Sequence, residues 1–223
     1  MDRDYSQNGD GGLMRSIVQV TTAPEHVALT TLDRVKLELG ITTEASDDLL
    51  RAKILEASSD IEAQCQRNFA AQGMTERFWG DPGCAEYFSL RQYPVTSVTS
   101  VTVDDVAVDS DEYRLDAETG LLYRLDASGY PCIWQWCKDV VIVYAGGYAM
   151  PESESPNLPA SLQAACVLLM NSYWSSRGRD PALRAEDIPG LGSATYWVGA
   201  VGESGQLPPE VMSRISPFRR PSA

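Results

Sequence analysis

Two adjacent helical segments within residues 30–68 constrain the fold of this chain more than any other stretch. The first starts after Thr31, whose hydroxyl can accept an N–H of the first turn, and stops at Gly40, which tolerates a left-handed end. The second starts at Ser46 or Asp47, whose side chains can accept the free N–H groups there. It runs for about twenty residues, so at 1.5 Å per residue it forms a rod of roughly 30 Å, the length of a small domain.

Apolar residues recur every three or four positions along the second segment, which is the pattern of a helix with one face in a core. A third helical pattern follows much later, in LPASLQAACVLLMNSYW, where Pro159 suits a first turn. This helix is more apolar than the others, so we expect it to pack against the second and to complete the core. The resulting core spine is predicted to contain Leu50, Ile54, Ile61, Cys65, Leu162 and Leu169.

Between these helices the hydrophobic period changes from that of a helix to that of a strand, with turn residues such as Asp81–Gly83 between the strands. The valines of VTSVTSVTVDD do not alternate strictly with polar residues, which predicts a bulge or an irregular entry into the strand, and YRLDAETGLLYRLD has the pattern of a hairpin. The predicted fold class is therefore α+β, a helical bundle of about three to four helices with an inserted antiparallel β-meander. The expected strands are Glu76–Trp79, Glu86–Leu90, Val95–Val103, Glu112–Leu115, Leu121–Leu125 and Val140–Ala145.

Both ends of the chain differ in composition from its middle. We expect an N-terminal arm over residues 1–27, with a short strand or extended piece at 14–22, a folded domain over 28–178 and a C-terminal arm over 179–223. The C-terminal arm ends in a helix of roughly nine residues that stops at Pro217. Such a helix is too short to be stable alone in water, so it needs a partner surface on this subunit or on another.

The chain of 223 residues carries a formal net charge of −13. Proteins that grip nucleic acid gain binding energy when cationic side chains displace counterions, so this charge argues against DNA binding and favours repulsion. No apolar run reaches the roughly 20 residues of a membrane span, and the first residues lack the apolar block of a signal peptide. We therefore expect no membrane contact and no export by that route. The five cysteines are scattered and are expected to be reduced thiols.

Four features resemble functional sites without meeting their requirements. The lone histidine, His26, has no second candidate ligand or nucleophile beside it. The pair Gly146–Gly147 follows a strand but lies in no phosphate-binding pattern, and the stretch Cys132–Cys137 lacks two further zinc ligands, so packing is favoured there. We expect no catalytic residue, no cofactor and no metal. A solvated hairpin loop is favoured over Ca²⁺ binding for the acidic cluster of Asp104, Asp105, Asp109, Asp111 and Glu112.

Six pieces of the chain, in order, resemble the head–tail connector, or adaptor, proteins of tailed bacteriophages. They cover about Leu29 to Trp174, and it is the ordered set that carries the resemblance. The closing LPPEVMSRISPFRR also resembles the C-terminal segment of many such adaptors. The six pieces are L-x-x-V-K-x-x-L-G-I, DDLLRAKILEASSDIEAQC, YPVTSVTSV, YRLD…GLLYR, DVVIVYAGGY and LPASLQAACVLLMNSYW.

The resemblance implies a structural virion protein rather than an enzyme, located at the junction of capsid and tail and present in the bacterial host cytoplasm during assembly. It implies a homo-oligomeric ring beneath the portal protein, expected to be dodecameric to match the portal, with a downstream neck or tail-completion protein as a second partner. DNA would pass through the ring without specific binding, and negative charge fits such a channel because like charges repel. In a closed ring, each interface joins two different faces of neighbouring copies.

We expect the C-terminal segment to dock on the portal, while the alternative that it folds back on its own subunit stays open. Two other functions also stay open. One is a neck stopper or tail-completion protein, a class that tends to be β-barrel-like. The other is a DNA-packaging regulatory protein that binds nucleic acid, which would need a basic face, whereas Arg51, Lys53 and Arg67 are interspersed with acids. The portal-docking candidates are Leu207, Val211, Ile215, Phe218, Arg219 and Arg220.

Overall fold

The computed structural model describes residues 15–79, 85–134, 139–177, 185–188, 192–195 and 207–220. They form two compact units. The β unit comprises the described parts of residues 1–24 and 71–147, and the helical unit those of residues 25–70 and 148–223. The expected α+β class, with the β region inserted between helices, is confirmed. The expected turn at 81–83 and the first part of the N-terminal arm lie outside the described residues.

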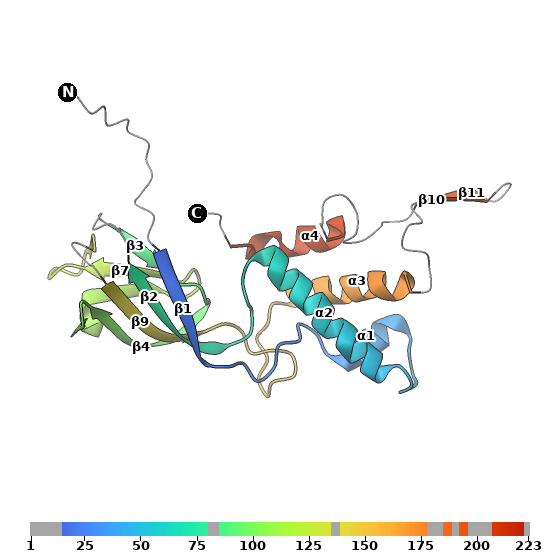
Figure 1. The fold of residues 1–223 in the computed structure, drawn as a ribbon, viewed down its shortest axis with the longest axis horizontal. Coiled ribbons are helices and arrows are strands. Elements are labelled where there is room, and N and C mark those ends of the chain that lie inside the picture. Colours follow the sequence, from blue (N-terminus) through green and yellow to red (C-terminus); the bar gives the residue numbers. More distant parts are fainter. Residues whose placement is uncertain are drawn as a thin grey trace, which may run out of the picture. The chain divides into compact units, whose positions relative to one another are not determined.

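The helical unit begins with a short helix whose ends follow the predicted caps. The Oγ1 atom of Thr31 accepts the N–H of Arg34 at 3.2 Å, and Gly40 ends the helix in the left-handed region at φ 67°. The α-helices of the described residues, labelled in Figure 1, are α1 (Leu32–Leu39), α2 (Asp47–Cys65), α3 (Ala160–Ser175) and α4 (Pro209–Ile215).

The start of α2 differs from the predicted cap. Ser46 occupies the N-cap position, but its side chain makes no hydrogen bond to the first turn. Asp47 is engaged elsewhere, because its Oδ1 atom accepts from Nζ of Lys36 at 2.7 Å in a largely buried ion pair. This pair ties the end of α1 to the start of α2. The carboxylates of Asp47 and Asp48 still lie where the helix dipole favours negative charge.

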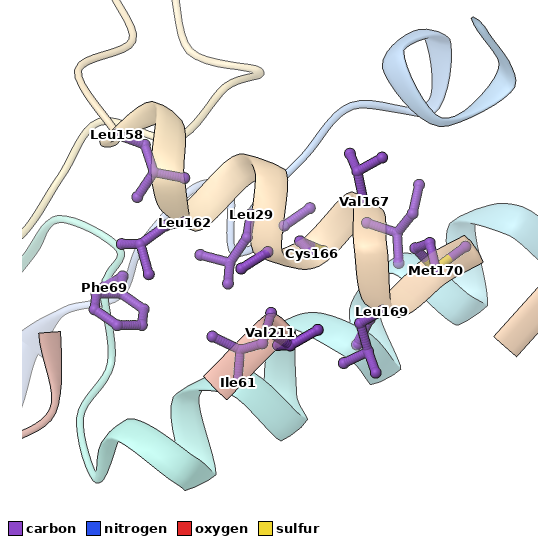
Figure 2. Packing of buried hydrophobic residues seen from close by; sticks show 14 of the residues in the cluster. Leu29, Ile61, Phe69, Leu158, Leu162, Cys166, Val167, Leu169, Met170 and Val211 are labelled. Carbon is purple, nitrogen blue, oxygen red and sulfur yellow. The ribbon is translucent and has the colours of Figure 1, made fainter. Parts of the chain in front are cut away.

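One hydrophobic core holds the helical unit together, and all six residues of the predicted core spine are buried in it. Figure 2 shows Leu162 and Leu169 of α3 directed toward α2, from which Ile61 points back. Each such side chain contributes about 1.5–3 kcal/mol by leaving water. The side chains of α2 and α3 therefore share this core with those of α1 and α4.

Two antiparallel sheets form the β unit. The first has the strand order β1-β2-β9-β4-β5, and the second has the order β3-β7-β6 with β8 paired to β7. Buried residues alternate along β2 and β9, and their side chains share one core with those of the second sheet. The strands are β1 (Arg15–Thr22), β2 (Gln72–Trp79), β3 (Tyr87–Ser89), β4 (Val95–Val103), β5 (Val106–Ala107), β6 (Tyr113–Asp116), β7 (Leu121–Leu125), β8 (Pro131–Cys132) and β9 (Asp139–Gly146). A separate two-stranded sheet pairs β10 (Ala185–Ile188) with β11 (Gly192–Thr195).

Local features of these sheets match the sequence patterns. The register of β4 against β9 shifts twice, between Val95 and Ser97 and again between Val98 and Ser100, so the predicted irregularity of this strand is confirmed. The predicted hairpin is β6–β7. Of the two possibilities for residues 14–22, the structure shows a strand, since β1 pairs with β2 along the edge of the first sheet. The position of β9, between β2 and β4, follows from no local pattern.

A close backbone approach explains the glycine at the end of β9. A Cβ atom on Gly146 would lie 2.7 Å from the carbonyl oxygen of Gln92 and 3.0 Å from that of Pro94. The next residue, Gly147, has φ 107°, a conformation that other residues rarely adopt. The glycine pair therefore serves close packing and a sharp turn.

The β unit also contains a buried carboxylate that sequence reasoning missed. Glu76 of β2 is 0% exposed. Its Oε1 accepts from the hydroxyl of Ser16 at 2.8 Å, and its Oε2 accepts from the hydroxyl of Tyr144 and from the N–H of Arg91, both at 3.0 Å. These bonds join β1, β2, β9 and the segment after β3. An acid on a strand otherwise patterned for a core was the only signal in the sequence.

Candidate assembly surfaces

The C-terminal segment packs on the helical unit of its own chain. Pro208 is the N-cap of α4 and Pro209 its first residue, as the proline pattern predicted. Leu207, Val211 and Ile215 are 4%, 1% and 0% exposed and belong to the same core as α2 and α3. Three of the portal-docking candidates thus contact their own subunit. This is the alternative in which the C-terminal segment folds back on its own chain.

A short 3₁₀ turn (Ser216–Phe218) follows α4. This turn and the residues after it contact the end of α2 and the segment that follows α2. The rings of Phe218 and Phe69 meet edge to face with centroids 6.4 Å apart, and the N–H of Arg220 donates to the carbonyl oxygen of Cys65 at 2.9 Å. Phe218 and Arg220 are half-buried, while Arg219 is exposed. Portal docking by this segment stays a prediction, and these three residues are the candidates that still reach the surface.

Two cysteines of the helical unit behave as small apolar side chains. Burial raises the pKa of the Cys65 thiol to about 11 and that of Cys166 to about 12. Both are free thiols, as is Cys132, which is half-buried in β8. Since the thiolate is the reactive form, Cys65 and Cys166 are unreactive at neutral pH while the helical unit stays folded.

A partly buried acid near the end of α2 makes stability depend on pH. The Oε1 atom of Glu62 accepts the N–H of Phe69 at 2.9 Å. Burial raises the pKa of Glu62 above 4.5, and the hydrogen bond from Phe69 offsets this only in part. A raised carboxyl pKa means that the folded state holds the proton more tightly than the unfolded state. The ionised group therefore costs stability above the folded-state pKa, and this cost disappears as the pH falls below 4.5.

Replacing Glu62 with glutamine is expected to stabilise the protein at pH 7 by at most about 1 kcal/mol, because the amide oxygen still accepts from Phe69 without carrying charge. Urea denaturation of both proteins at pH 7 and at pH 4 measures the difference. We expect the advantage of the variant to shrink at pH 4. An advantage that is the same at both pH values would contradict this assignment.

The acidic cluster of the β unit is exposed and already serves the turns that it occupies. Asp104 and Asp105 adopt positive φ in the β4–β5 turn, and Oδ1 of Asp104 accepts the N–H of Asp139 at 3.1 Å. Glu112 forms an ion pair with Arg124 at 3.3 Å. Within the described part of the chain, no group of three His, Cys, Asp or Glu residues could hold a metal ion.

The stretch CIWQWC contributes packing where the structure describes it. The ring of Trp134 is 2% exposed and lies against Phe88, with centroids 4.8 Å apart. Its Nε1–H donates to the carbonyl oxygen of Leu122 at 3.4 Å. Trp136 and Cys137 lie outside the described residues.

The remaining single candidates have ordinary surface roles. Nδ1 of His26 lies 3.5 Å from a carboxylate oxygen of Glu152, and the ring is partly exposed.

The cations on which a DNA-binding function would depend are not arranged as a basic face. Arg51 lies 3.8 Å from Asp48, Lys53 lies 2.6 Å from Glu56, and Arg67 is buried against the ring of Phe69. No helix in the described ranges is both long enough and apolar enough to cross a membrane.

A surface hollow between α2 and α3 is a feature that sequence reasoning missed. It has a volume of about 310 Å³. Two sequence signals could have indicated it: Leu49 of α2 lies off the apolar stripe, and Trp174 stands at the end of the most apolar helix. We call it the α2–α3 hollow, and it is lined by Leu49, Lys53, Met170, Tyr173, Trp174, Ser176 and Arg177.

The chain is an α+β protein with a helical spine, an inserted β unit and a C-terminal helix that packs on the helical core. The chain belongs to the head completion protein family, whose sequence profile matches residues 28–183. The resemblance to head–tail connector proteins is thereby confirmed. No functionally curated protein matches the chain.

Solved structures with the same fold come from gene transfer agent (GTA) particles. One is the neck of an empty GTA particle computed with C6 symmetry, with a TM-score of 0.56 and 19% identity. Another is the neck of a native GTA particle computed with C12 symmetry, with a TM-score of 0.52 and 19% identity. A third is the virion of a native gene transfer agent particle, with a TM-score of 0.56 and 18% identity. Each match covers 93% of this chain and 97% of the other, so the likeness in fold extends over nearly the whole protein.

Proposed function

We propose that this chain is a head–tail adaptor of a virion, which forms a ring beneath the portal and links the DNA-filled capsid to the neck and tail. The observation that carries the proposal is the family match over residues 28–183, which includes α1 to α3 and the β unit from β2 to β9. The symmetric necks that share this fold support a ring of identical copies. A dodecamer matches the symmetry of one of them.

The charge of the chain supports passage of DNA through such a ring. With a net charge of −13, each copy repels the phosphate backbone, so DNA moves past without adhering. The exposed acids of the β4–β5 turn and of the turn before β6 are candidates for the surface that faces the channel or the tail. The cations Arg51 and Lys53 lie beside carboxylates, which removes support for a DNA-binding regulator.

A neck stopper or tail-completion protein is the second candidate function. It is favoured by the β unit, whose two packed sheets resemble the β-rich architecture expected of that class. Electron microscopy of the full-length protein mixed with its portal distinguishes the two. An adaptor adds a ring directly to the portal, whereas a stopper binds only when an adaptor is already present. Portals that stay bare in this mixture would overturn the adaptor proposal.

The portal-docking residues are best tested by substitution. Deleting the segment from Leu207 onward would also remove three core side chains, so lost binding would have two explanations. Arg219→Glu changes an exposed charge at the end of the segment. We expect it to weaken binding to portal rings about tenfold while leaving the midpoint of thermal unfolding unchanged.

Arg214→Glu is the matched control, because it makes the same charge change at an exposed position on α4. Binding is measured by cosedimentation of each variant with portal rings at 150 mM salt. If Arg219→Glu binds as tightly as the wild type, this segment does not dock on the portal. The ring proposal itself then still rests on the electron microscopy.

A further inference from the structure

The α2–α3 hollow is suited to an apolar side chain from another molecule. Its volume of about 310 Å³ lies at the small end of the range for ligand pockets, roughly 300–1,000 Å³. A small-molecule site also needs convergent polar groups, but those near the hollow are already engaged. Tyr173 donates its hydroxyl to Asp60, and Lys53 is paired with Glu56. What remains is an apolar floor that includes Leu49, which is 39% exposed.

A protruding side chain of matching character lies on α1. This helix buries Leu32 and Val35, while Leu37 points away from the stripe and is 79% exposed, the highest value among the large apolar side chains that the structure describes. Single exposed leucines are common on protein surfaces. Leu37 differs in having a complementary surface on the same chain. Because α1 contributes no lining residue to the hollow, each copy presents both surfaces at once.

The charges around the two surfaces are also complementary. Asp33, one helical turn before Leu37, and Glu38, next to it, are exposed and form no ion pair with any described residue. The hollow is bordered by Arg177, whose guanidinium lies 4.9 Å from the ring centroid of Trp174. Copies with a net charge of −13 repel one another. A contact that places carboxylates beside a cation offsets that repulsion where the copies meet.

We propose that Leu37 of one copy inserts into the α2–α3 hollow of the next copy, and that this contact closes the ring. The inference rests on the proposed adaptor function, since it describes how the ring is built. The contact joins two different faces, so every copy gives one Leu37 and receives another. Head-to-tail contacts of this kind form a closed ring when the rotations between neighbouring copies add up to a full turn.

Substituting Leu37 tests the contact without disturbing the fold, because the side chain is exposed in the free subunit. Leu37→Asp is expected to weaken each contact between copies by roughly thirtyfold or more, as for a central anchor of an interface. Rings on the portal should then be lost, while the thermal unfolding curve of the variant stays that of the wild type. Leu55→Asp is the matched control, since Leu55 is 48% exposed on α2, does not line the hollow and should leave the rings intact.

Cross-linking tests the identity of the two surfaces. Cys84, Cys132 and Cys137 are first replaced by serine, whereas the buried Cys65 and Cys166 are kept. In this full-length background, a chain with both Leu37→Cys and Ser176→Cys is assembled on portal rings and treated with a short thiol cross-linker. We expect a ladder of covalent oligomers up to the full ring. Either single cysteine alone, or Leu55→Cys paired with Ser176→Cys, should give no ladder.

The outcomes separate this inference from the adaptor proposal. Wild-type rings on the portal together with a ladder support both. Rings that form normally with Leu37→Asp, or that give no ladder, overturn the contact and leave the adaptor function standing. A Ser176→Cys cross-link to the portal, or within one chain, shows that the hollow has a different occupant and also overturns the contact. If the wild-type protein forms no ring on the portal, both proposals fail.

Discussion

Replacing Glu76 with alanine is expected to lower the free energy of unfolding of the β unit by about 3–5 kcal/mol. The carboxylate is fully buried and accepts three hydrogen bonds. Its removal leaves the buried hydroxyl of Tyr144 and the partly buried N–H of Arg91 without this acceptor, and a buried donor left unsatisfied costs about 1–3 kcal/mol. The vacated volume adds a cavity cost.

The environment of Tyr144 supports this expected loss of stability. Burial raises the pKa of its hydroxyl, and the negative charge of Glu76 raises it further, so the hydroxyl stays protonated and donates to the carboxylate. Glu76→Gln should cost less than Glu76→Ala, because the amide keeps one acceptor and most of the volume. Glu86→Ala, at an exposed position of the same unit, is the control. Urea denaturation compares the three, and an equal loss for Glu76→Ala and Glu86→Ala would refute the role of the buried network.

Ile215→Asp is expected to destabilise the helical unit by at least about 4 kcal/mol. Ile215 is 0% exposed in the core shared by α2, α3 and α4. Removing a buried isoleucine side chain costs about 2–5 kcal/mol, and placing a carboxylate in this apolar core adds a desolvation cost. α4 has only seven residues, so without this packing it does not stay helical.

The matched control is Ser213→Asp, which adds the same charge at an exposed position of α4. Denaturation and limited proteolysis of the C-terminal segment follow the effect. If both variants unfold alike, α4 is not part of the core in the free subunit. The apolar side chains of this segment would then be available to the portal, which was the expectation from the sequence.

Local sequence signals predicted the elements of this fold well. Thr31 and Gly40 delimit α1 because their effects depend only on neighbouring backbone groups. The valine spacing in β4 revealed its irregular register for the same reason. Ser46 shows the limit of such reasoning, since it occupies the cap position without forming the bond. Here the ion pair between Asp47 and Lys36, a contact across eleven residues, occupies the neighbouring carboxylate.

The surfaces for assembly were harder to predict. The apolar spacing of Val211 and Ile215 indicates a buried face but does not say which molecule covers it. Leu37 and Leu49 look like ordinary members of amphipathic helices until burial shows that neither belongs to the core of its own chain.

The sequence by itself determined the α+β class, the helix caps, the apolar spine and the acidic charge, because each depends on residue type and on spacing along one segment. Only the tertiary structure decided that β9 lies between β2 and β4, that Glu76 is satisfied inside the β unit and that α4 covers its own core. These depend on contacts between residues far apart in the chain, and many partners satisfy the same local pattern equally well. Long-range packing selects one set of partners, because only that set buries the apolar faces and also pairs the polar groups.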